Sequence, residues 1–447
     1  MIEELKLYPP LAYGRLGPST TPCPNYDFGP SDLHPRGSGK TIIRPAETLS
    51  VAADGTVTAS TPAAVAFKDA AGFRPVCPFF ELHGTWVLGG ERQSGPITLA
   101  VLQDNGVRLA DVRWRVSVAN LKAHHYTLAN GDRIAASAEL AGDDTGKRTL
   151  RGASPQSAPR PLVPAGRSVP LGNVQLTRPT AGFPELRLRF TPAGGFVYGP
   201  TDLPARGSRF VLPLERLILN PDSAWGRFVV SGDDPRVAPA ALFAGADDVG
   251  RSLGLVDDTC DGVVRCTVPG VPPVVARIVV GPPDFAPDRR PVVSAADGLT
   301  DRVRRGDVRD PAYVADESLT TLEIRDLMER VLETMDNMNL DAENSRLGGE
   351  FPLLEPLPGR PLPLTEFGRQ KHRRFVALEV FEDILREQPD LVERVIREPL
   401  AQSPVFDRRM PALMRGADGR PMHLTRRQYD LLMAWGERLR RTIEEGT

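Results

Sequence analysis

The sequence is short of several features that would place it quickly in a functional class. Four cysteines in 447 residues are too few for a disulfide scaffold. None of them forms a Cys-x-x-Cys pair, so a structural zinc site has little support. The 55 basic and 57 acidic residues nearly cancel, which leaves no overall field to collect nucleic acid or anionic lipid. No stretch approaches the ~18 consecutive apolar residues of a membrane span.

A targeting signal is also missing from the first residues. Residues 1–6, Met-Ile-Glu-Glu-Leu-Lys, are acidic and contain none of the apolar core of a secretory signal. Thiols in such a chain are expected to be reduced and buried. The sequence therefore predicts a cytoplasmic protein that binds neither nucleic acid nor membrane.

Motifs for common catalytic sites are incomplete. The tail Gly39-Lys40-Thr41 imitates a phosphate-binding loop, but His34 stands where the pattern needs its first glycine. The serines offer no Gly-x-Ser-x-Gly elbow. His124 and His125 are adjacent and lack a third ligand at metal-binding spacing. If the preceding strand continues through them, they point to opposite faces. No catalytic residue can be named from these patterns.

Proline and glycine, by contrast, are abundant, with 44 and 41 residues and no period. They indicate many turns, short strands and long ordered loops. The length suggests two or three domains of ~150 residues each. Residues 1–300 carry mainly strand signals, and residues 301–447 carry helical periodicity. The predicted class is α+β, with a β-rich, sandwich-like N-terminal domain over 1–300 and a mainly helical region over 301–447.

Alternation of apolar and polar residues predicts the strands of the first part. They are expected at residues 97–102, 107–109, 114–120, 186–190, 227–230 and 274–280. The first two flank Asn105-Gly106 and are predicted to form a β-hairpin. Residues 1–60 are expected to be rich in loops, because prolines interrupt their apolar runs.

Helical spacing governs the second part. One apolar stripe consists of Ile324, Leu327, Met328, Val331, Leu332, Met335 and Met338. Thr320 with Glu323, and Thr425 with Gln428, are predicted capping boxes at the starts of two helices. Further helices are expected over residues 375–385 and 392–396. The methionine-rich stripe is interpreted as core rather than as a ligand surface.

An acidic segment is the most distinctive stretch, and it reads Asp257-Asp258-Thr259-Cys260-Asp261-Gly262. A strand with Val264, Cys266 and Val268 on one face follows it. Asp and Gly are turn residues, so a structural turn is the simpler interpretation and a pocket wall the other. The Ca²⁺ loop pattern with its distal Glu is missing. Candidate binding residues for such a wall are Asp257, Asp258, Cys260, Asp261, His124 and His125.

A loop pattern occurs twice. Residues 28–38, Phe-Gly-Pro-Ser-Asp-Leu-His-Pro-Arg-Gly-Ser, are echoed by residues 198–208, Tyr-Gly-Pro-Thr-Asp-Leu-Pro-Ala-Arg-Gly-Ser. The aromatic-Gly-Pro, Asp-Leu and Arg-Gly-Ser parts keep their spacing. We expect a recurring structural loop in which the Asp or the Ser/Thr caps backbone groups and the Arg pairs locally. Duplicated ligand binding is the alternative.

Several stretches, in the same order along the chain, resemble the lysine 6-oxidase (lysine ε-oxidase) family of quinone-dependent amino-acid oxidases. Each is similar to a motif of that family: residues 8–17 (Tyr-Pro-Pro-Leu-Ala-Tyr-Gly-Arg-Leu-Gly), 67–72 (Phe-Lys-Asp-Ala-Ala-Gly), 114–123 (Trp-Arg-Val-Ser-Val-Ala-Asn-Leu-Lys-Ala), 257–263, 282–287 (Pro-Pro-Asp-Phe-Ala-Pro), 291–293, 410–413 and 424–435. In the acidic segment, Cys260 stands in the place of a serine and Val263 in that of a proline. The resemblance implies an oxidase scaffold that acts on amino groups with O₂.

The departures from that family concern the chemistry. The family's cysteine tryptophylquinone arises from a Trp and a Cys, and the resemblance places both beyond residue 447. No cysteine follows Cys266, and Trp435 is the only tryptophan in the last two hundred residues. Residues 301–447 would then be truncated relative to the family's C-terminal domain. No cofactor is expected in this chain, and no catalytic residue carries over to a position here.

Three functional hypotheses follow. The first is a scaffold subunit, or degenerate homologue, of an oxidase that needs a second protein to supply the missing C-terminal half. The resemblance also implies a flavoprotein for cofactor maturation, and a homo-oligomer is a further alternative. The second is a non-catalytic binding or assembly protein on the same fold. The third and weakest is a hydrolase or metalloenzyme that uses His124, His125 and the acidic segment.

Overall fold

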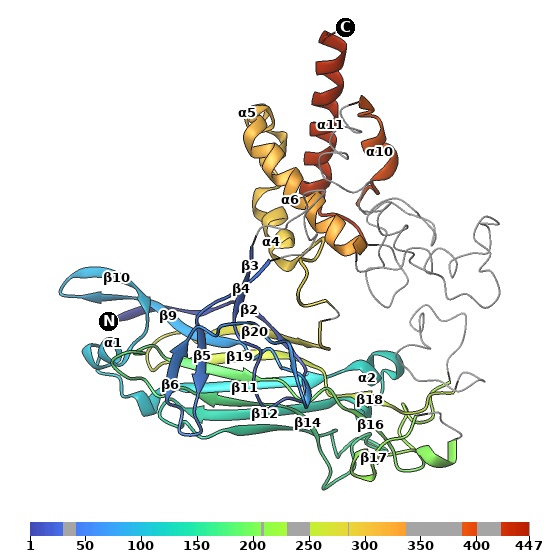
Figure 1. Ribbon diagram of the computed structural model, residues 1–447. Helices are drawn as coiled ribbons and strands as arrows, with labels where there is room; N and C mark the ends of the chain where they lie inside the picture. Colours follow the sequence, from blue (N-terminus) through green and yellow to red (C-terminus); the bar gives the residue numbers. More distant parts are fainter. Residues whose placement is uncertain are drawn as a thin grey trace. The chain divides into compact units, whose positions relative to one another are not determined.

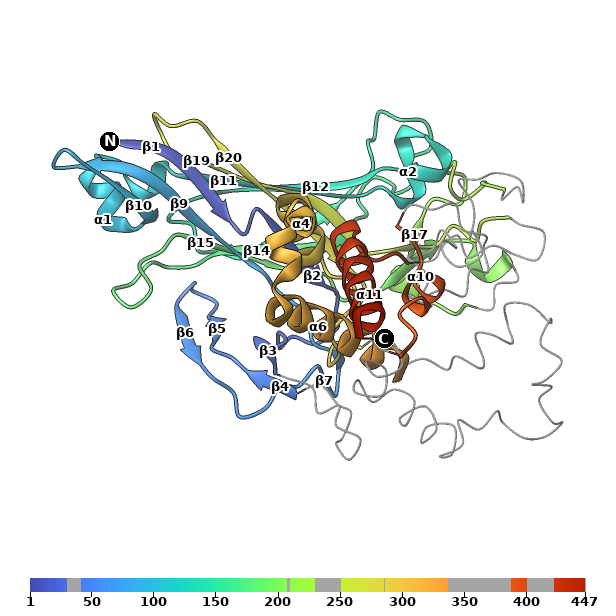
Figure 2. The same ribbon diagram turned by 90° about the horizontal axis from the view of Figure 1, so that it is seen from above.

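The computed structural model describes residues 1–29, 42–206, 210–229, 251–284, 286–336, 387–399 and 422–446. Strands predominate before residue 285 and helices after it, as Figures 1 and 2 show, so the predicted α+β class is confirmed. The chain divides into two compact units. The β-rich unit consists of Met1–Tyr26 and Pro45–Phe285, and the helical unit of Asp27–Arg44 and Ala286–Thr447.

A six-stranded sheet forms one layer of the β-rich unit. In spatial order its strands are β1 (Ile2–Tyr8), β9 (Phe79–Leu88), β15 (Arg187–Thr191), β14 (Val169–Leu176) and β13 (Arg148–Gly152), with β10 (Glu91–Pro96) also pairing with β9. Period-2 alternation along β9 buries Phe80, Leu82, Gly84 and Trp86 and leaves the residues that alternate with them half-buried. The predicted strand at 186–190 is thus confirmed as β15.

A five-stranded sheet forms the other layer. Its spatial order is β12 (Ile134–Ala141), β11 (Arg113–Asn120), β19 (Cys260–Thr267), β20 (Val274–Gly281) and β2 (Leu11–Arg15). Every pairing is antiparallel except that of β2 with β20. The strands predicted at 114–120 and 274–280 are therefore confirmed, and Val264, Cys266 and Val268 are fully buried on one face as expected.

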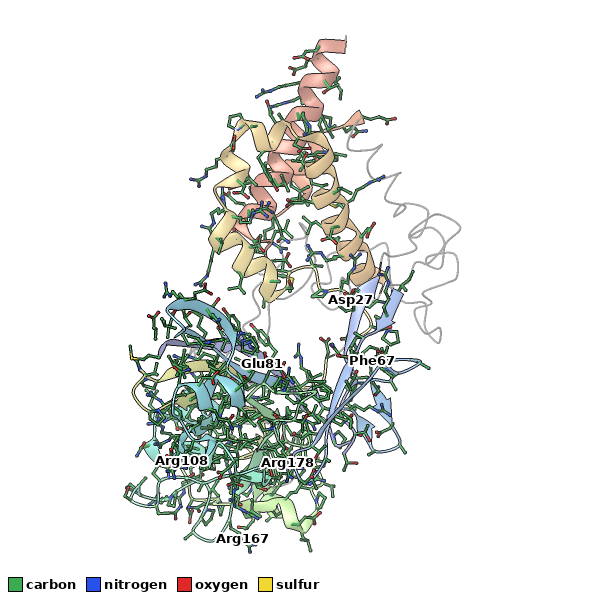
Figure 3. The ribbon with its side chains drawn as sticks, turned by 90° about the vertical axis from the view of Figure 1, so that its left-hand side faces the viewer. Asp27, Phe67, Glu81, Arg108, Arg167 and Arg178 are labelled. Carbon is green, nitrogen blue, oxygen red and sulfur yellow. The ribbon has the colours of Figure 1, made fainter. Side chains whose placement is uncertain are left out.

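Side chains from both sheets form one apolar core, so the expected sandwich-like packing is present (Figure 3). The largest of its fully buried members are Trp114, Phe80, Phe190, Leu82, Ile97 and Leu102. Glu81, which Figure 3 labels, lies between the buried Phe80 and Leu82 on β9 and pairs with Arg187 on the opposite face of the sheet. Alternation thus separates the ion pairs from the core.

Two strand predictions were wrong in the β-rich unit. Residues 97–109 form no hairpin: Leu99–Asp104 is helix α1, and a 3₁₀ turn covers Leu109–Asp111. Of the strand predicted at 227–230, the described residues 227–229 contribute only an isolated bridge, from Val229 to Arg251. In addition, residues 1–60 contain more strand than expected, because β1 and β2 belong to the two main sheets.

Smaller elements complete the chain before residue 285. They are the strand pairs β3 (Tyr26–Gly29) with β4 (Ile42–Pro45), β5 (Thr48–Val51) with β6 (Val57–Ser60) and β7 (Lys68–Asp69) with β8 (Gly72–Phe73), the short sheet β17 (Leu217–Leu219)–β16 (Val197–Pro200)–β18 (Val256–Asp257), helix α2 (Lys122–Thr127) and 3₁₀ turns at Asn130–Asp132, Leu203–Arg206 and Leu214–Arg216. Two of these elements, β3 and β4, fall almost entirely within the Asp27–Arg44 segment of the helical unit. The short sheet carries the start of the acidic segment.

The helical unit contains α4 (Ala295–Arg304), α5 (Pro311–Ala315), α6 (Glu317–Asp336), α10 (Leu391–Val395) and α11 (Arg426–Gly446), with a 3₁₀ turn at Asp307–Arg309. The apolar stripe of α6 is confirmed at its described side chains, because Ile324, Leu327, Met328 and Val331 are buried in one cluster. The side chains of Leu332, Met335 and Met338, and the helix expected at 375–385, lie outside the described residues. None of the described helices is both long and apolar enough to cross a membrane.

One of the two predicted capping boxes is confirmed. At the start of α11, the Thr425 amide donates to Gln428 Oε1 at 3.0 Å and the Gln428 amide donates to Thr425 Oγ1 at 3.2 Å. The other was wrong: α6 begins a turn before Thr320, whose hydroxyl donates to the Asp316 carbonyl at 2.9 Å. Glu323 instead pairs with the buried Arg427 at 2.5 Å.

Candidate functional site

The acidic segment lies where three elements of the β-rich unit meet. Asp257 ends β18, and Cys260 already begins β19, so the turn is only Asp258-Thr259. Asp257 Oδ1 accepts hydrogen bonds from Thr259 Oγ1 at 2.6 Å and from Asn120 Nδ2 at 3.2 Å. Its other oxygen forms an ion pair with Lys122 at the start of α2. Asp257 therefore fastens the end of β11 and the start of α2 to the β18–β19 turn.

Asp258 points into the interior and is 1% exposed. Its Oδ2 accepts hydrogen bonds from the backbone amides of Phe196 at 3.0 Å and Gly195 at 3.2 Å. Its Oδ1 is buried without a hydrogen-bond partner in the described part of the chain. Burial raises the pKa of this carboxyl to about 6, although the two amides favour the charged form. Asp258 is thus a buried acid that can titrate near neutral pH.

Cys260 and Asp261 face opposite sides of the five-stranded sheet. The Cys260 thiol is buried and donates to the Leu171 carbonyl at 3.4 Å, and burial raises its pKa to about 12. Asp261 is exposed, and partial desolvation raises its pKa against the influence of Lys122. Because a thiol with a raised pKa is a poor nucleophile, the structure favours a packing role for Cys260.

Gly262 is required by close approach rather than by a left-handed backbone. A Cβ atom at this position would lie 2.3 Å from the Ser117 carbonyl oxygen on β11, which no side chain tolerates. The glycine therefore allows β11 and β19 to pair directly after the acidic turn. This corrects the interpretation of Gly262 as a turn residue chosen for positive φ.

The two adjacent histidines do not join the acidic residues. They lie on helix α2, not on a continued strand, so the expectation that they face opposite sides of a sheet was wrong. His124 Nδ1 is 2.9 Å from the Ala129 carbonyl oxygen. The His125 ring packs edge-on against Tyr126, with centroids 5.3 Å apart. Their described contacts are thus those of a helix end and an aromatic cluster.

That aromatic cluster is a feature the sequence did not reveal. Tyr126 stacks on Trp225 with ring centroids 5.5 Å apart, and Trp225 stacks on Phe228 at 5.8 Å. The Trp225 indole donates to the Leu255 carbonyl at 3.0 Å, two residues before Asp257. The cluster joins α2 to the segment that leads into β18. About 100 residues separate Tyr126 from Trp225, so no local pattern could have predicted the contact.

The repeated loop has a structural role in its second copy. Arg206 donates to both oxygens of Asp202, at 2.8 and 3.1 Å. Its remaining N–H groups donate to the carbonyls of Gly226 (2.8 Å), Ser252 (3.1 Å) and Pro221 (3.3 Å). The local pairing predicted for the Arg of this loop is therefore present here, but Asp202 holds the Arg and not the backbone groups that it was expected to cap. Most of the first copy, from residue 30, lies outside the described residues.

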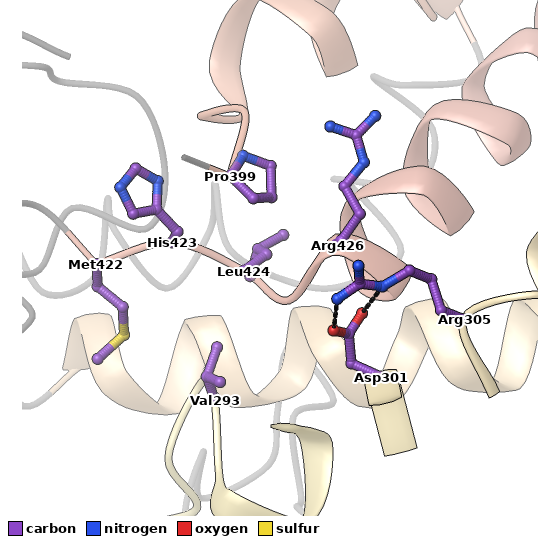
Figure 4. Close-up of a pocket in the computed structure, with 8 residues that line it drawn as sticks. All are labelled: Val293, Asp301, Arg305, Pro399, Met422, His423, Leu424 and Arg426. Carbon is purple, nitrogen blue, oxygen red and sulfur yellow. Dashed lines mark hydrogen bonds and ion pairs between the residues drawn. The ribbon is translucent and has the colours of Figure 1, made fainter. Parts of the chain in front are cut away.

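The helical unit contains a cavity of about 350 Å³, drawn in Figure 4. Its walls are Val293, Asp301, Arg305, Pro399, Met422, His423, Leu424 and Arg426. Arg305 faces Asp301 in a forked ion pair, and Arg426 pairs with Glu398 at 3.0 Å and Asp430 at 2.8 Å. Both guanidinium groups are thus already neutralised, and the rest of the lining is mainly apolar. No sequence motif marked this cavity.

A metal ion and a quinone would each require particular side chains. No cluster of three or more His, Cys, Asp or Glu side chains suited to a metal ion occurs among the described residues. For the quinone, one Trp–Cys pair deserves a test: Trp114 on β11 stands directly opposite Cys266 on β19. Both are sealed in the core, with 1% and 0% exposure, and burial raises the pKa of the Cys266 thiol. A quinone must meet its amine substrate, so this pair does not fit the cofactor and packs as core.

The two buried thiols offer a matched stability test. In the variant Cys260→Ser, the new hydroxyl can donate to the Leu171 carbonyl, so we expect a loss of less than about 1 kcal/mol in the free energy of unfolding. In Cys266→Ser, the hydroxyl enters the apolar core at a position with 0% exposure, and the expected loss is about 1–3 kcal/mol. Urea unfolding of both variants measures the difference. Equal losses would contradict the assigned role of the Leu171 carbonyl.

Comparison with known proteins gives a limited result. No protein-family pattern matches the chain, and no curated protein sequence is significantly similar to it. Among solved structures, it is similar to L-Lys epsilon-oxidase from Marinomonas mediterranea, at 16% identity in each of three structures. The Schiff base intermediate with L-Lys gives a TM-score of 0.48, and two further structures give 0.46 and 0.44. In the first, the match covers 97% of this chain and 61% of the oxidase. The chain thus spans about three fifths of that oxidase, and a likeness at this level transfers no site residue.

Proposed function

We propose that this chain is the scaffold part of an amino-acid oxidase of the lysine ε-oxidase type, and that it acts only with a second protein that supplies the quinone-bearing part. One observation supports this most. Stretches that resemble the family are far apart in the sequence, yet they contact one another in the fold. Asn120 and Lys122, from the Trp114 stretch, hold Asp257 of the acidic segment.

The N-terminal stretch shows the same behaviour. Arg15 donates to the Pro282 carbonyl at 3.3 Å and pairs with Asp284 at 3.4 Å, both in the Pro-Pro-Asp stretch. Ser19, just after the same stretch, donates to Asp69 of the Lys-Asp-Ala stretch. Residues that jointly specify a scaffold are expected to contact one another in this way, whereas unrelated chance matches would not.

A non-catalytic binding or assembly protein is the second candidate, and one observation favours it. Two groups of the acidic segment that could react are engaged or sealed off: Asp257 holds Asn120, Lys122 and Thr259, and the Cys260 thiol is buried. A segment engaged in this way has lost, or never had, direct contact with a substrate. In this second candidate, the protein keeps the fold and uses it to bind other proteins without catalysing a reaction.

Oxygen consumption separates the two candidates. The purified chain is assayed with a panel of amino acids, alone and after co-expression with the neighbouring reading frame and a flavoprotein for cofactor maturation. The scaffold proposal expects no activity alone and amino-acid-dependent oxygen uptake in the co-purified complex. Redox-cycling staining of the denatured complex should place the quinone on the partner chain. Quinone staining of this chain, or a complex that forms without oxidase activity, would overturn the scaffold proposal.

A further inference from the structure

The outer face of the five-stranded sheet carries an unusual set of arginines. On this face Arg113 and Arg115 project from β11, Arg265 from β19 and Arg277 from β20, and all four are exposed. Figure 1 shows these strands side by side with β12. The acidic residues on the same face of these strands are Glu139 and Asp261, and Asp111, just before β11, interacts electrostatically with Arg113. Its local charge is therefore positive, although the whole chain is nearly neutral.

The register places like charges directly opposite each other. Arg115 on β11 is the cross-strand partner of Arg265 on β19. Side chains in such positions have Cβ atoms roughly 5 Å apart, and like charges there destabilise the sheet. Arg115 has a counter-ion, because it pairs with Glu139 at 3.3 Å. No salt bridge within the described residues involves Arg113, Arg265 or Arg277.

The surface beside these arginines is suited to contact with another chain. An open hollow of about 450 Å³ is lined by Arg115, by Asp261 and by mostly small residues: Ser117, Val118, Ala119, Ala135, Ala136, Ser137 and Gly262. On the other side, Tyr13 and Val275 are 46% and 48% exposed. Arginine, tyrosine and a flat surface of small residues together are typical of a protein interface.

We propose that this face is a docking surface for an acidic polypeptide segment, anchored by Arg113, Arg265 and Arg277. An acidic partner would supply negative charges that the neighbouring strands do not place opposite these arginines. This would explain why the destabilising pairing of Arg115 with Arg265 is present. The proposal depends on the scaffold function only in expecting that a partner exists. The arginines would bind an acidic segment whatever chemistry the complex performs.

Binding of fluorescein-labelled poly-L-glutamate, followed by fluorescence anisotropy, tests the surface in the full chain. The wild type should bind at low salt and lose affinity as salt rises. The variant Arg113→Gln/Arg265→Gln/Arg277→Gln should bind roughly tenfold more weakly, since three exposed charge pairs, each worth about twofold in affinity, are removed. Arg265→Gln alone should keep or raise the melting temperature, because cross-strand repulsion is relieved.

The matched control is Arg151→Gln/Arg167→Gln/Arg302→Gln, which removes the same charge from exposed positions elsewhere. It should change binding less than about twofold if the effect is local. Equal weakening by both triple variants, no binding by the wild type, or tighter binding of an oligonucleotide through the same arginines would each overturn the proposal. Because poly-L-glutamate binding requires no oxidase activity, failure here is distinguishable from failure of the proposed function.

Discussion

Replacing Asp258 with Asn should change how the stability of the β-rich unit depends on pH. The folded carboxyl has a pKa of about 6, above the value of 3.8 for a free Asp. The folded state therefore holds the proton more tightly than the unfolded state. The stabilisation due to that proton is complete below pH 3.8 and is lost as the pH rises through 6. At about 1.4 kcal/mol per pH unit, the loss is about 3 kcal/mol.

An Asn at this position cannot titrate and should not show the loss. We expect the free energy of unfolding of Asp258→Asn, relative to the wild type, to increase by about 2.4 kcal/mol between pH 4 and pH 7, because part of the wild-type stabilisation is already lost at pH 4. Urea unfolding followed by tryptophan fluorescence measures it in a Trp435→Phe background, in which the remaining tryptophans, Trp86, Trp114 and Trp225, all lie in the β-rich unit. The exposed Asp261, changed to Asn, is the control and should show a smaller slope. If the free energies of unfolding of Asp258→Asn and wild type changed in parallel with pH, the raised pKa of Asp258 would be contradicted.

Removal of the Arg206 side chain should have the other large effect. All five of its N–H donors are used, on Asp202 and on three backbone carbonyls. Arg206→Ala leaves the three backbone carbonyls without these donors at a site where the Arg206 side chain is 14% exposed, whereas Asp202, at 44% exposure, can bind water instead. The expected loss is about 3–5 kcal/mol in the free energy of unfolding, at about 1–3 kcal/mol for each unsatisfied buried carbonyl. Arg206→Lys should recover only part of it, because an ammonium has three donors and lacks the planar fork.

Arg227 provides the comparison. It pairs with Asp222 at the surface, where both side chains are more than half exposed. Arg227→Ala should therefore change the free energy of unfolding by less than about 1 kcal/mol. Measured in the same Trp435→Phe background, a loss of similar size in both variants would show that Arg206 is no more than a surface charge.

Much of the fold could be predicted where the spacing of apolar residues along the sequence matches the buried side of a strand or helix. Alternation around Trp114 and Val264 identified two central strands, and helical spacing from Ile324 to Val331 identified the core face of α6. Both patterns arise because one side of each element faces an apolar core. The spacing of the apolar residues in these strands and in α6 therefore indicates directly which side of the element is buried.

The predictions that were wrong involve signals with two meanings. Asn105-Gly106 resembled a hairpin turn, but Gly106 adopts φ of +69° and ends helix α1. The Val107 amide donates to the Leu102 carbonyl and the Gly106 amide to the Gln103 carbonyl, the bonds of a Schellman cap. Thr98, whose hydroxyl accepts from the Val101 amide, was the local sign of a helix start.

The candidate site depended on contacts that no local pattern encodes. The acidic segment was found from its composition, but the partners of Asp258 are backbone amides some 60 residues earlier. The sequence could not show that this carboxyl is buried, nor that Asp257 faces Lys122. The two histidines follow β11 closely in the sequence, which is why they were grouped with the acidic segment. In the structure they lie on helix α2 and make other contacts.

The parallel pairing of β2 with β20 has a consequence for synthesis on the ribosome. Residues 11–15 cannot complete the five-stranded sheet until residues 274–281 have emerged. At a translation rate of roughly 5–20 residues per second, β2 remains without its partner strand β20 for tens of seconds. A newly made N-terminal segment therefore exposes unpaired backbone groups through much of translation, when chaperone binding would protect it most. Slowed translation ahead of residue 281 should accordingly lower the soluble yield more than slowed translation after it.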